Sequence, residues 1–388
     1  MRTTTAKQKR RMLTVLAVAV ALIVPTCGSA RAMEEQQKEA AVPLRRMGSV
    51  DLGILAETTP VVWKNDSLLL ECIQGGRYYD NINYKTYPGL PQPPGYLRFV
   101  NILTGVRSKP FGFGYGLGNA LVVDGRMHVF ATRTPFGISS NNTEVSIFSS
   151  DDLLTWATNV ALRVDERGMF PPGVTLRKVF NTCVRPAGEN DEFAYVMAYE
   201  FNEPGVGWQT GFAVTEDSDL RHASWTCVPR PQVLRFATLA HANPTLRRSK
   251  DGWWYLISTR ETHNILAQEI WRTKNVTSFL WEATPAWKER DVTAGALLSP
   301  SAADQIPVSP PWHPDTHSAV AGNKTALKNA ENINVSDLDL CTITLPNGTV
   351  ATIIYYAWGD QKLGPTAMVL SMAMAVGIDE DAFLASRF

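Results

Sequence analysis

The stretch "SSDDLLTW", residues 149–156, contains a tight acidic turn that leads directly to a tryptophan. Serine and aspartate favour turns because their side chains hydrogen-bond to nearby backbone groups. Similar sequence returns in "TEDSDLRHASW", which ends at Trp225, and in "RTKNVTSFLW", which ends at Trp281. Each copy has an aspartate or asparagine a few residues before its tryptophan. The recurrence indicates a repeated structural unit.

The repeat has a regular period. Asn119, Asn181 and Asn243 each open a strand-like run, and they are spaced 62 residues apart. One further step back reaches Glu57, at the head of "TTPVVWKND". The next copy, "SDLDLCTITLPNG", follows Asn243 after 94 to 96 residues, as expected if about 32 residues were inserted. The chain therefore contains five units.

Each unit has the pattern of a strand, a turn and a second strand. Asp124-Gly125 and Asn347-Gly348 lie between apolar runs, and such dipeptides are the strongest short-range signal of a β-hairpin. About four short strands per unit, without helical periodicity, are typical of a β-propeller blade. The sequence predicts an all-β fold, a five-bladed β-propeller. The acidic turn is expected between outer strands of a blade, with its tryptophan packed against the next blade.

Residues 1–32 have the pattern of a secretory signal peptide. Basic residues precede an apolar run at 12–24, which is too short to span a membrane comfortably, and Ala30-Arg31-Ala32 matches a cleavage site. Six glycosylation sequons fit a eukaryotic secreted chain, and they begin at Asn65, Asn141, Asn275, Asn323, Asn334 and Asn347. We expect the mature chain outside the cell or in the secretory-pathway lumen, with no membrane segment.

The mature chain is expected to contain an N-terminal segment, residues 33–49, followed by the propeller, residues 50–388. Residues 286–332 are rich in Ala, Ser and Pro and lack strand periodicity. This composition predicts a long loop insertion before the last blade. Cys72 and Cys341 belong to the first and last units, which a closed ring makes neighbours, so a disulfide between them is one option.

The charge balance excludes some classes of partner. The chain has 37 basic and 37 acidic residues, which leaves no electrostatic footprint for nucleic acid or an anionic membrane. We therefore expect neutral partners. Eleven tryptophans and eleven tyrosines suit stacking on sugar rings as well as packing between blades. The sequence predicts no cofactor and no metal site.

Two sets of side chains are expected at the propeller axis. The innermost strands surround the axis, and the residues at their starting ends are Glu57, Asn119, Asn181, His241 with Asn243, and Asp337 with Asp339. The second set ends the next strand of each unit, and it consists of Glu71, Arg133, Glu200, Arg260 and Trp358. Antiparallel pairing brings these strand ends together. The two sets are therefore expected to form either a ligand site or a solvated pore.

The chain resembles the five-bladed β-propeller glycosidases, a superfamily that contains arabinanases, β-xylosidases, levansucrases and invertases. The resemblance covers about residues 50–388 and depends on the five units, the "SSDDLLTW" turn and the closing unit "NVSDLDL…IIYYAWGDQ". It implies a glycoside hydrolase that acts on an oligosaccharide or polysaccharide through paired carboxylates. One carboxyl group protonates the leaving oxygen, and the other activates water or attacks the anomeric carbon.

The resemblance also implies roles for individual residues. Glu200 is the candidate general acid, and we expect partial burial to raise its pKa. An ion pair between Glu200 and an arginine is the structural alternative. The predicted catalytic residues are Glu57, Glu200 and Asp339, with Glu57 where these families usually place aspartate. The predicted substrate-binding residues are Asn119, Arg133, Asn181, His241, Arg260, Asp337 and Trp358.

Two alternatives follow from departures from the family pattern. Asn119 and Asn181 stand where an acidic residue is expected, and amides cannot transfer protons as carboxylates can. A noncatalytic glycan-binding propeller is therefore one alternative. A sialidase-like propeller is another, because "SSDDLLTW" approximates the sialidase Asp-box with Leu153 in place of glycine. Arg133 and Arg260 could supply two members of an arginine triad.

Overall fold

The structure is a computed structural model, and it describes most of the predicted strands. The described residues are 42–49, 58–73, 95–134, 143–163, 178–189, 191–203, 207–228, 241–262, 265–277, 281–284, 297–298, 334–359 and 368–388. Within these ranges the chain forms strands and one short helix, α5 (Glu380–Ala385). The predicted all-β fold is confirmed. No helix in the described ranges is long and apolar enough to cross a membrane.

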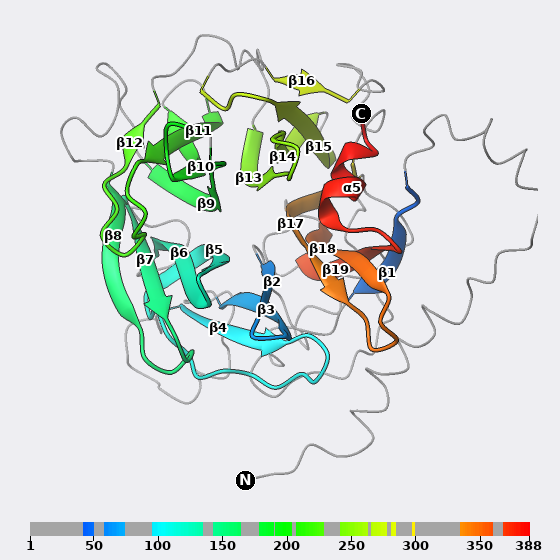
Figure 1. Ribbon diagram of the computed structural model, residues 1–388, viewed down its shortest axis with the longest axis horizontal. Coiled ribbons are helices and arrows are strands. Elements are labelled where there is room, and N and C mark those ends of the chain that lie inside the picture. The colour runs from blue at the N-terminus through cyan, green and yellow to red at the C-terminus, as the bar shows by residue number, and fades with distance from the viewer. Residues whose placement is uncertain are drawn as a thin grey trace, which may run out of the picture.

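The strands form antiparallel groups around a central axis (Figure 1). The first three groups follow chain order, with the innermost strand first. The first group contains β2 (Thr59–Trp63), β3 (Asp66–Ile73) and β4 (Tyr96–Asn101). The second contains β5 (Tyr115–Val123), β6 (Arg126–Arg133), β7 (Glu144–Ser150) and β8 (Ala157–Arg163). The third contains β9 (Lys178–Pro186), β10 (Tyr195–Glu203), β11 (Gly207–Thr215) and β12 (Thr226–Cys227).

The remaining strands form one eight-stranded sheet. Its first part contains β13 (His241–Arg248), β14 (Trp254–Thr262), β15 (Ile265–Thr273) and β16 (Glu282–Ala283). Its second part contains β17 (Asn334–Thr344), β18 (Val350–Gly359), β19 (Met368–Val376) and β1 (Arg45–Ser49). A single parallel pair, Leu266 with Asn334, joins the two parts. The number of blades therefore stays our interpretation.

The innermost strands close a ring. β2, β5, β9, β13 and β17 contact one another in this order, and β17 contacts β2. Strand β1, from the N-terminal segment, pairs with β19 at the outer edge of the last sheet. This pairing was not predicted, because residues 33–49 lie outside the repeat. The two ends of the described chain thus meet in one sheet.

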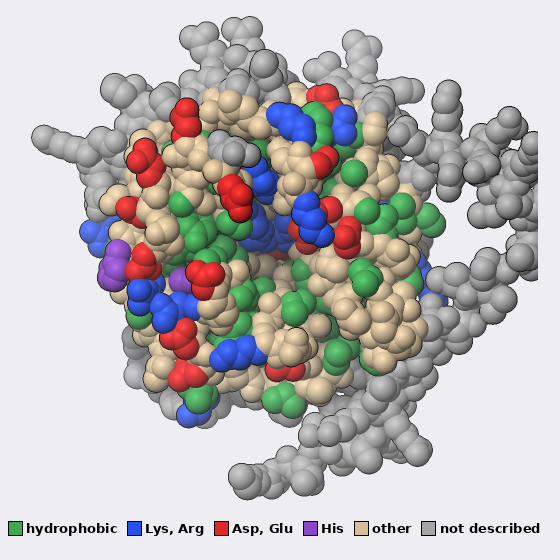
Figure 2. Space-filling model, viewed as in Figure 1, with side chains coloured by type: hydrophobic (Ala, Val, Ile, Leu, Met, Phe, Trp, Pro, Cys, Tyr) green, Lys and Arg blue, Asp and Glu red, His purple; other side chains and the backbone are tan. Residues whose placement is uncertain are grey.

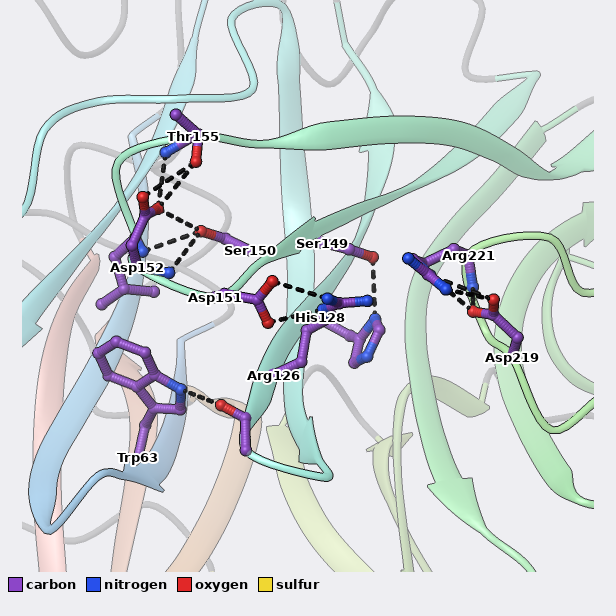
Figure 3. A network of polar contacts seen from close by, with 12 residues as sticks. Trp63, Arg126, His128, Ser149, Ser150, Asp151, Asp152, Thr155, Asp219 and Arg221 are labelled. Atoms are coloured by element: carbon purple, nitrogen blue, oxygen red, sulfur yellow. Dashed lines mark hydrogen bonds and ion pairs between the residues drawn. The ribbon is translucent and has the colours of Figure 1, made fainter.

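The acidic turn is held by its own side chains (Figure 3). Asp152 Oδ1 accepts hydrogen bonds from the backbone N–H groups of Thr155 and Leu154, each at 2.8 Å. These donors lower the pKa of Asp152 to about 2. Leu153 has a φ of 58°, the left-handed value that glycine adopts most easily. The turn therefore resembles an Asp-box in geometry even though leucine replaces its glycine.

The tryptophans after these turns connect neighbouring sheets. The pairs are Trp156 stacked on Phe111 with centroids 3.8 Å apart, Trp225 edge-on to Phe130 at 5.9 Å, and Trp281 stacked on Phe212 at 5.6 Å. In each pair the phenylalanine precedes the sheet that carries the tryptophan. The prediction of packing against the next blade was therefore wrong. Sheet twist rotates the outer strands relative to the inner strands, and here it directs them towards the preceding sheet.

Apolar packing holds the sheets together. Leu69, Leu97 and Phe130 are fully buried, and clusters of such side chains fill the spaces between neighbouring sheets. Cys72 and Cys341 are free thiols, so the disulfide considered between them does not form. Of the expected insertion, only Leu297 and Leu298 lie among the described residues, and Leu298 pairs with Gln268.

Candidate functional site

The same backbone irregularity recurs in four of the innermost strands. In β5, β9, β13 and β17 an extra residue interrupts the pairing with the following strand, which is a β-bulge. Each bulge contains a residue with positive φ, and these are Leu117 (53°), Asn181 (41°), Asn243 (54°) and Asp337 (54°). A bulge bends its strand and redirects nearby side chains. All four of these residues line one cavity on the axis.

The bulges also show which residues occupy matching positions. They align Leu117, rather than Asn119, with Asn181 and Asn243. The 62-residue spacing therefore placed the second unit two residues out of register. Connections between sheets vary in length without changing the strands, so a constant spacing is only an approximate guide to equivalence. The residue that matches Asn119 in the last sheet is Asp339.

The axial cavity is small and polar. Its volume is about 310 Å³ when space open to solvent is included, and about 30 Å³ is accessible to the centres of water molecules. The second value is the one comparable with known cavities; it has room for about two water molecules and lies well below the roughly 300 to 1,000 Å³ of small-molecule sites. Its polar lining includes Thr59, Asn119, Asn181, Asn243, Asp337 and Asp339. The structure therefore brings together five residues of the first expected set, Asn119, Asn181, Asn243, Asp337 and Asp339, and adds Thr59.

Glu200 lies directly behind the cavity wall. Its Oε2 accepts hydrogen bonds from Asn181 Nδ2 and from the backbone N–H of Asn243, each at 2.8 Å. Glu200 is 5% exposed and does not itself line the cavity. Burial raises its pKa from 4.5 to about 7, the two hydrogen bonds oppose the rise, and the charge of Asp337 adds to it. Both protonation states of Glu200 are therefore accessible near neutral pH.

Asp339 is fixed by contacts to both carboxylate oxygens. Its Oδ2 accepts a hydrogen bond from Asn119 Nδ2 at 2.9 Å, and its Oδ1 accepts one from the backbone N–H of Leu340 at 2.8 Å. Arg247 Nη2 also donates to Oδ1. Asp339 and Arg247 are 4% and 3% exposed, so this is a buried ion pair. The contacts restrict Asp339 to one orientation at the cavity wall.

Two arginines at the axis were not predicted. Arg185 Nη1 donates to Asn119 Oδ1 at 3.1 Å, and Arg247 pairs with Asp339. Figure 2 shows basic side chains gathered around a central hollow on the face that carries α5. In sequence both arginines resemble surface residues. The available signal was strand alternation, which places Arg247 on the same side of β13 as Thr245.

In the second predicted set, Glu200 contacts two cavity-lining residues, Asn181 and Asn243. It lies opposite the start of a bulge, at the position that Thr132, Thr259 and Ala357 occupy in other sheets. Arg133, Arg260 and Trp358 each lie one residue further along their strands. Because successive side chains of a strand point to opposite faces, these three point away from the side that Glu200 faces.

The other members of the second set lie in ion pairs, in an apolar cluster or at the surface. Glu71 is fully buried and forms ion pairs with Arg98 at 2.5 Å and Arg107 at 3.5 Å. Arg260 Nη1 lies 3.8 Å from Glu269 Oε2, Trp358 belongs to an apolar cluster, and Arg133 is exposed. The prediction that the second set meets the first at the axis therefore holds for Glu200. For Arg133, Arg260 and Trp358 it is wrong, because each lies one residue further along its strand than the position that matches Glu200.

Two predicted residues cannot be placed at the site. Glu57 lies outside the described residues, and His241 begins β13 with a side chain outside the described part. Their roles stay predictions. Within the described ranges, no group of three or more His, Cys, Asp or Glu side chains could hold a metal ion.

Comparison with known proteins supports the fold. No protein-family model and no curated protein matches the chain. A solved structure described as "Glycoside hydrolase" is similar with a TM-score of 0.55 and 10% identity, covering 90% of this chain and 96% of that chain. For a second solved structure, described as an RGII complex of BT0996, the TM-score is 0.54 and the identity 10%, over 89% and 95% of the two chains.

A third solved structure, "Native Bacillus subtilis Arabinanase Arb43A", has a TM-score of 0.48 and 11% identity, over 85% of this chain and 96% of that chain. That TM-score is too low for the likeness to support a conclusion. At these identities the first two similarities show a shared fold. They extend over 90% and 89% of this chain, so the fold is shared over most of its length.

Proposed function

We propose that the axial cavity is the active site of a glycoside hydrolase, with Glu200 as general acid and Asp337 or Asp339 as the second carboxylate. One observation carries the proposal: a buried carboxyl group with a pKa of about 7 contacts two cavity-lining residues, and two further carboxylates line the same cavity. Glycoside hydrolysis requires such a pair. The fold shared with a structure described as "Glycoside hydrolase" supports this choice.

The contacts of Glu200 indicate where its proton resides. Asn181 and the backbone of Asn243 both donate to Oε2, so the acidic proton is carried by Oε1. Because Glu200 lies behind the cavity wall, in the proposed reaction the Oε1 proton reaches the leaving oxygen of the glycosidic bond through one water molecule. The negative charge that then develops on Glu200 is stabilised by the two donors already aimed at Oε2.

The second carboxylate has two candidates with different surroundings. Asp339 has contacts on both oxygens, which suit a fixed negative charge beside an oxocarbenium-like transition state. Asp337 Oδ2 accepts a hydrogen bond from Ser336 Oγ at 2.6 Å, and its charge contributes to the raised pKa of Glu200. This electrostatic coupling favours Asp337 as the base or nucleophile that works with Glu200.

The lining also favours a class of substrate. Asn119, Asn181 and Asn243 each offer both donors and acceptors, which match the hydroxyl groups of sugars. We therefore propose a neutral oligosaccharide or polysaccharide as the substrate.

The test is a screen of the purified chain against chromogenic glycosides and neutral polysaccharides, with release of product as the readout. We expect turnover of at least one substrate, and a loss of kcat in Asp337→Asn. Binding to a glycan array without turnover of any substrate would instead support the noncatalytic glycan-binding alternative. Hydrolysis confined to sialosides would support the sialidase-like one.

We also propose that the chain is exported and glycosylated. The support is the N-terminal sequence pattern together with sequons that the fold leaves exposed at Asn65, Asn275 and Asn347. Asn334 begins β17 and is fully buried. Mass spectrometry of secreted material should find glycans at the three exposed sites and none at Asn334. An intact, unglycosylated chain in the cytosol would overturn this proposal.

A further inference from the structure

A chain of buried contacts connects the C-terminal helix to the cavity. Arg247, on β13, donates from Nη2 to Asp339, and its Nε lies 3.0 Å from Glu380 Oε1. Its Nη1 donates to the backbone oxygen of Leu246 at 2.7 Å. The guanidinium is planar and rigid, so contacts to Nε and Nη2 together fix its orientation. Glu380 and Asp339 thus contact two adjacent nitrogens of the same guanidinium.

The helix that carries Glu380 is itself fixed. α5 lies beside β17 and β18 in Figure 1 and contacts both strands. The backbone N–H of Glu380 donates to Thr342 Oγ1 at 2.8 Å, and Phe383 and Leu384 are fully buried. Arg387 Nη2 donates to the backbone oxygen of Val42 at 2.7 Å. Glu380 therefore projects from a rigid element rather than from a loose chain end.

We propose that Glu380 is a positioning residue of the site, which fixes the Arg247 guanidinium so that Asp339 keeps a single orientation at the cavity wall. The consequence for catalysis rests on the proposed hydrolase function. The geometry of the Arg247–Asp339 pair does not depend on that function. Without the contact to Nε, Arg247 keeps its charge and its bonds to Leu246, Leu340 and Asp339, but its guanidinium can tilt about these contacts and shift Asp339 with it.

We expect this role to depend on the length of the Glu380 side chain rather than on its charge. Burial raises the pKa of Glu380, and the charges of Arg247 and Arg185 oppose the rise, while those of Asp339 and Asp381 add to it. A neutral side chain of the same length keeps an oxygen at the position of Glu380 Oε1, 3.0 Å from Arg247 Nε. A shorter acid keeps the charge but withdraws its oxygens by about 1.5 Å.

The test compares Glu380→Asp, which shortens the side chain, with Glu380→Gln, which preserves its length. Asp381→Asn, on the next residue of the same helix, is the matched control. We expect Glu380→Asp to lower kcat roughly 10-fold to 100-fold with little change in KM, because small misplacements of reacting groups have effects of this size. Glu380→Gln and Asp381→Asn should stay within about threefold of wild type.

Crystal structures of the same variants provide a readout that does not need a substrate. Arg247 should occupy more than one rotamer, or lose its contact to Asp339, in Glu380→Asp, and it should keep the wild-type rotamer in Glu380→Gln. An unchanged Arg247 in Glu380→Asp would overturn the proposal. If wild type hydrolyses nothing, the hydrolase function fails, and the crystal structures still decide the positioning role. A loss of kcat in Glu380→Gln, with Glu380→Asp close to wild type, would overturn the proposal by showing that charge matters instead of reach.

Discussion

The second sheet, β5 to β8, and the third sheet, β9 to β12, share one backbone plan and differ in the residue that lies opposite the bulge. Both have a bulge in the innermost strand, and the residue opposite the start of the bulge is Thr132 in β6 and Glu200 in β10. Thr132 is fully buried, and its Oγ1 has no hydrogen-bond partner among the described residues. Glu200 has two partners on the cavity wall. At the same position of the repeated fold, the second sheet thus has a buried threonine and the third sheet has the candidate general acid.

The largest expected effect is on catalysis. Glu200→Gln keeps the shape and the acceptor oxygen but removes the acidic proton. We expect the rate of hydrolysis to fall about 100-fold to 10,000-fold, which is typical for loss of a general acid. Steady-state kinetics on any glycoside identified by the screen measures this. A rate near that of wild type would show that Glu200 is not the general acid. The difference between Glu200 and Thr132 would then have no consequence for function.

The next effect is on stability and its dependence on pH. Glu200 has a folded pKa of about 7, raised from 4.5, so between these values the folded state holds a proton that the unfolded state has lost. Wild type should therefore lose stability as pH rises through this window, by about 3 kcal/mol in all at about 1.4 kcal/mol per pH unit. Glu200→Gln should lack this decline.

Urea unfolding of both proteins at several pH values measures the difference. We expect the free energy of unfolding of wild type, relative to Glu200→Gln, to be highest near about pH 4.5 and lowest above about pH 8. A constant difference across this range would mean that Glu200 has no raised pKa in the folded state.

The smallest effect is at the matching position of the second sheet. Thr132→Val replaces an unpaired buried hydroxyl with a methyl group of similar shape. We expect the free energy of unfolding to rise by about 1 kcal/mol, because the cost of burying the hydroxyl disappears. Activity should not change. A loss of activity in Thr132→Val would place Thr132 in the site and remove the contrast between the sheets.

The repeated features of the fold could be predicted from the sequence. The hairpin dipeptides and the recurring turn before Trp156 identified the strands and their grouping, because these signals are local and depend on a few residues. The side on which Trp156 packs was not predictable in this way, because sheet twist decides it. The pairing of β1 with β19 joins distant parts of the chain, and no local sequence pattern predicts it.

The site could be predicted in part for a similar reason. Asn119, Asn181, Asp337 and Asp339 stand at recognisable strand starts, and all four line the cavity. Arg133, Arg260 and Trp358 were assigned by counting along the following strands. A count that misses a bulge misaligns residues between sheets, and a shift of one residue moves a side chain to the opposite face.

The contacts across the axis could not be predicted from spacing at all. Arg247 meets Asp339 across 92 positions of sequence, and Glu380 joins them from the end of the chain. In sequence Arg247 sits in the polar run "LRRSKDG", which is typical of a surface strand end. Only the closed ring of innermost strands brings these side chains together.

The most direct test of the account is a titration of the Glu200 carboxyl group itself. Difference infrared spectroscopy between wild type and Glu200→Gln isolates the C=O stretch of the protonated acid. We predict that this band is present near about pH 6 and disappears with a midpoint near pH 7. Absence of the band from about pH 5 upward would show that Glu200 is ionised wherever an ordinary carboxylate is. Glu200 could then not serve as the general acid.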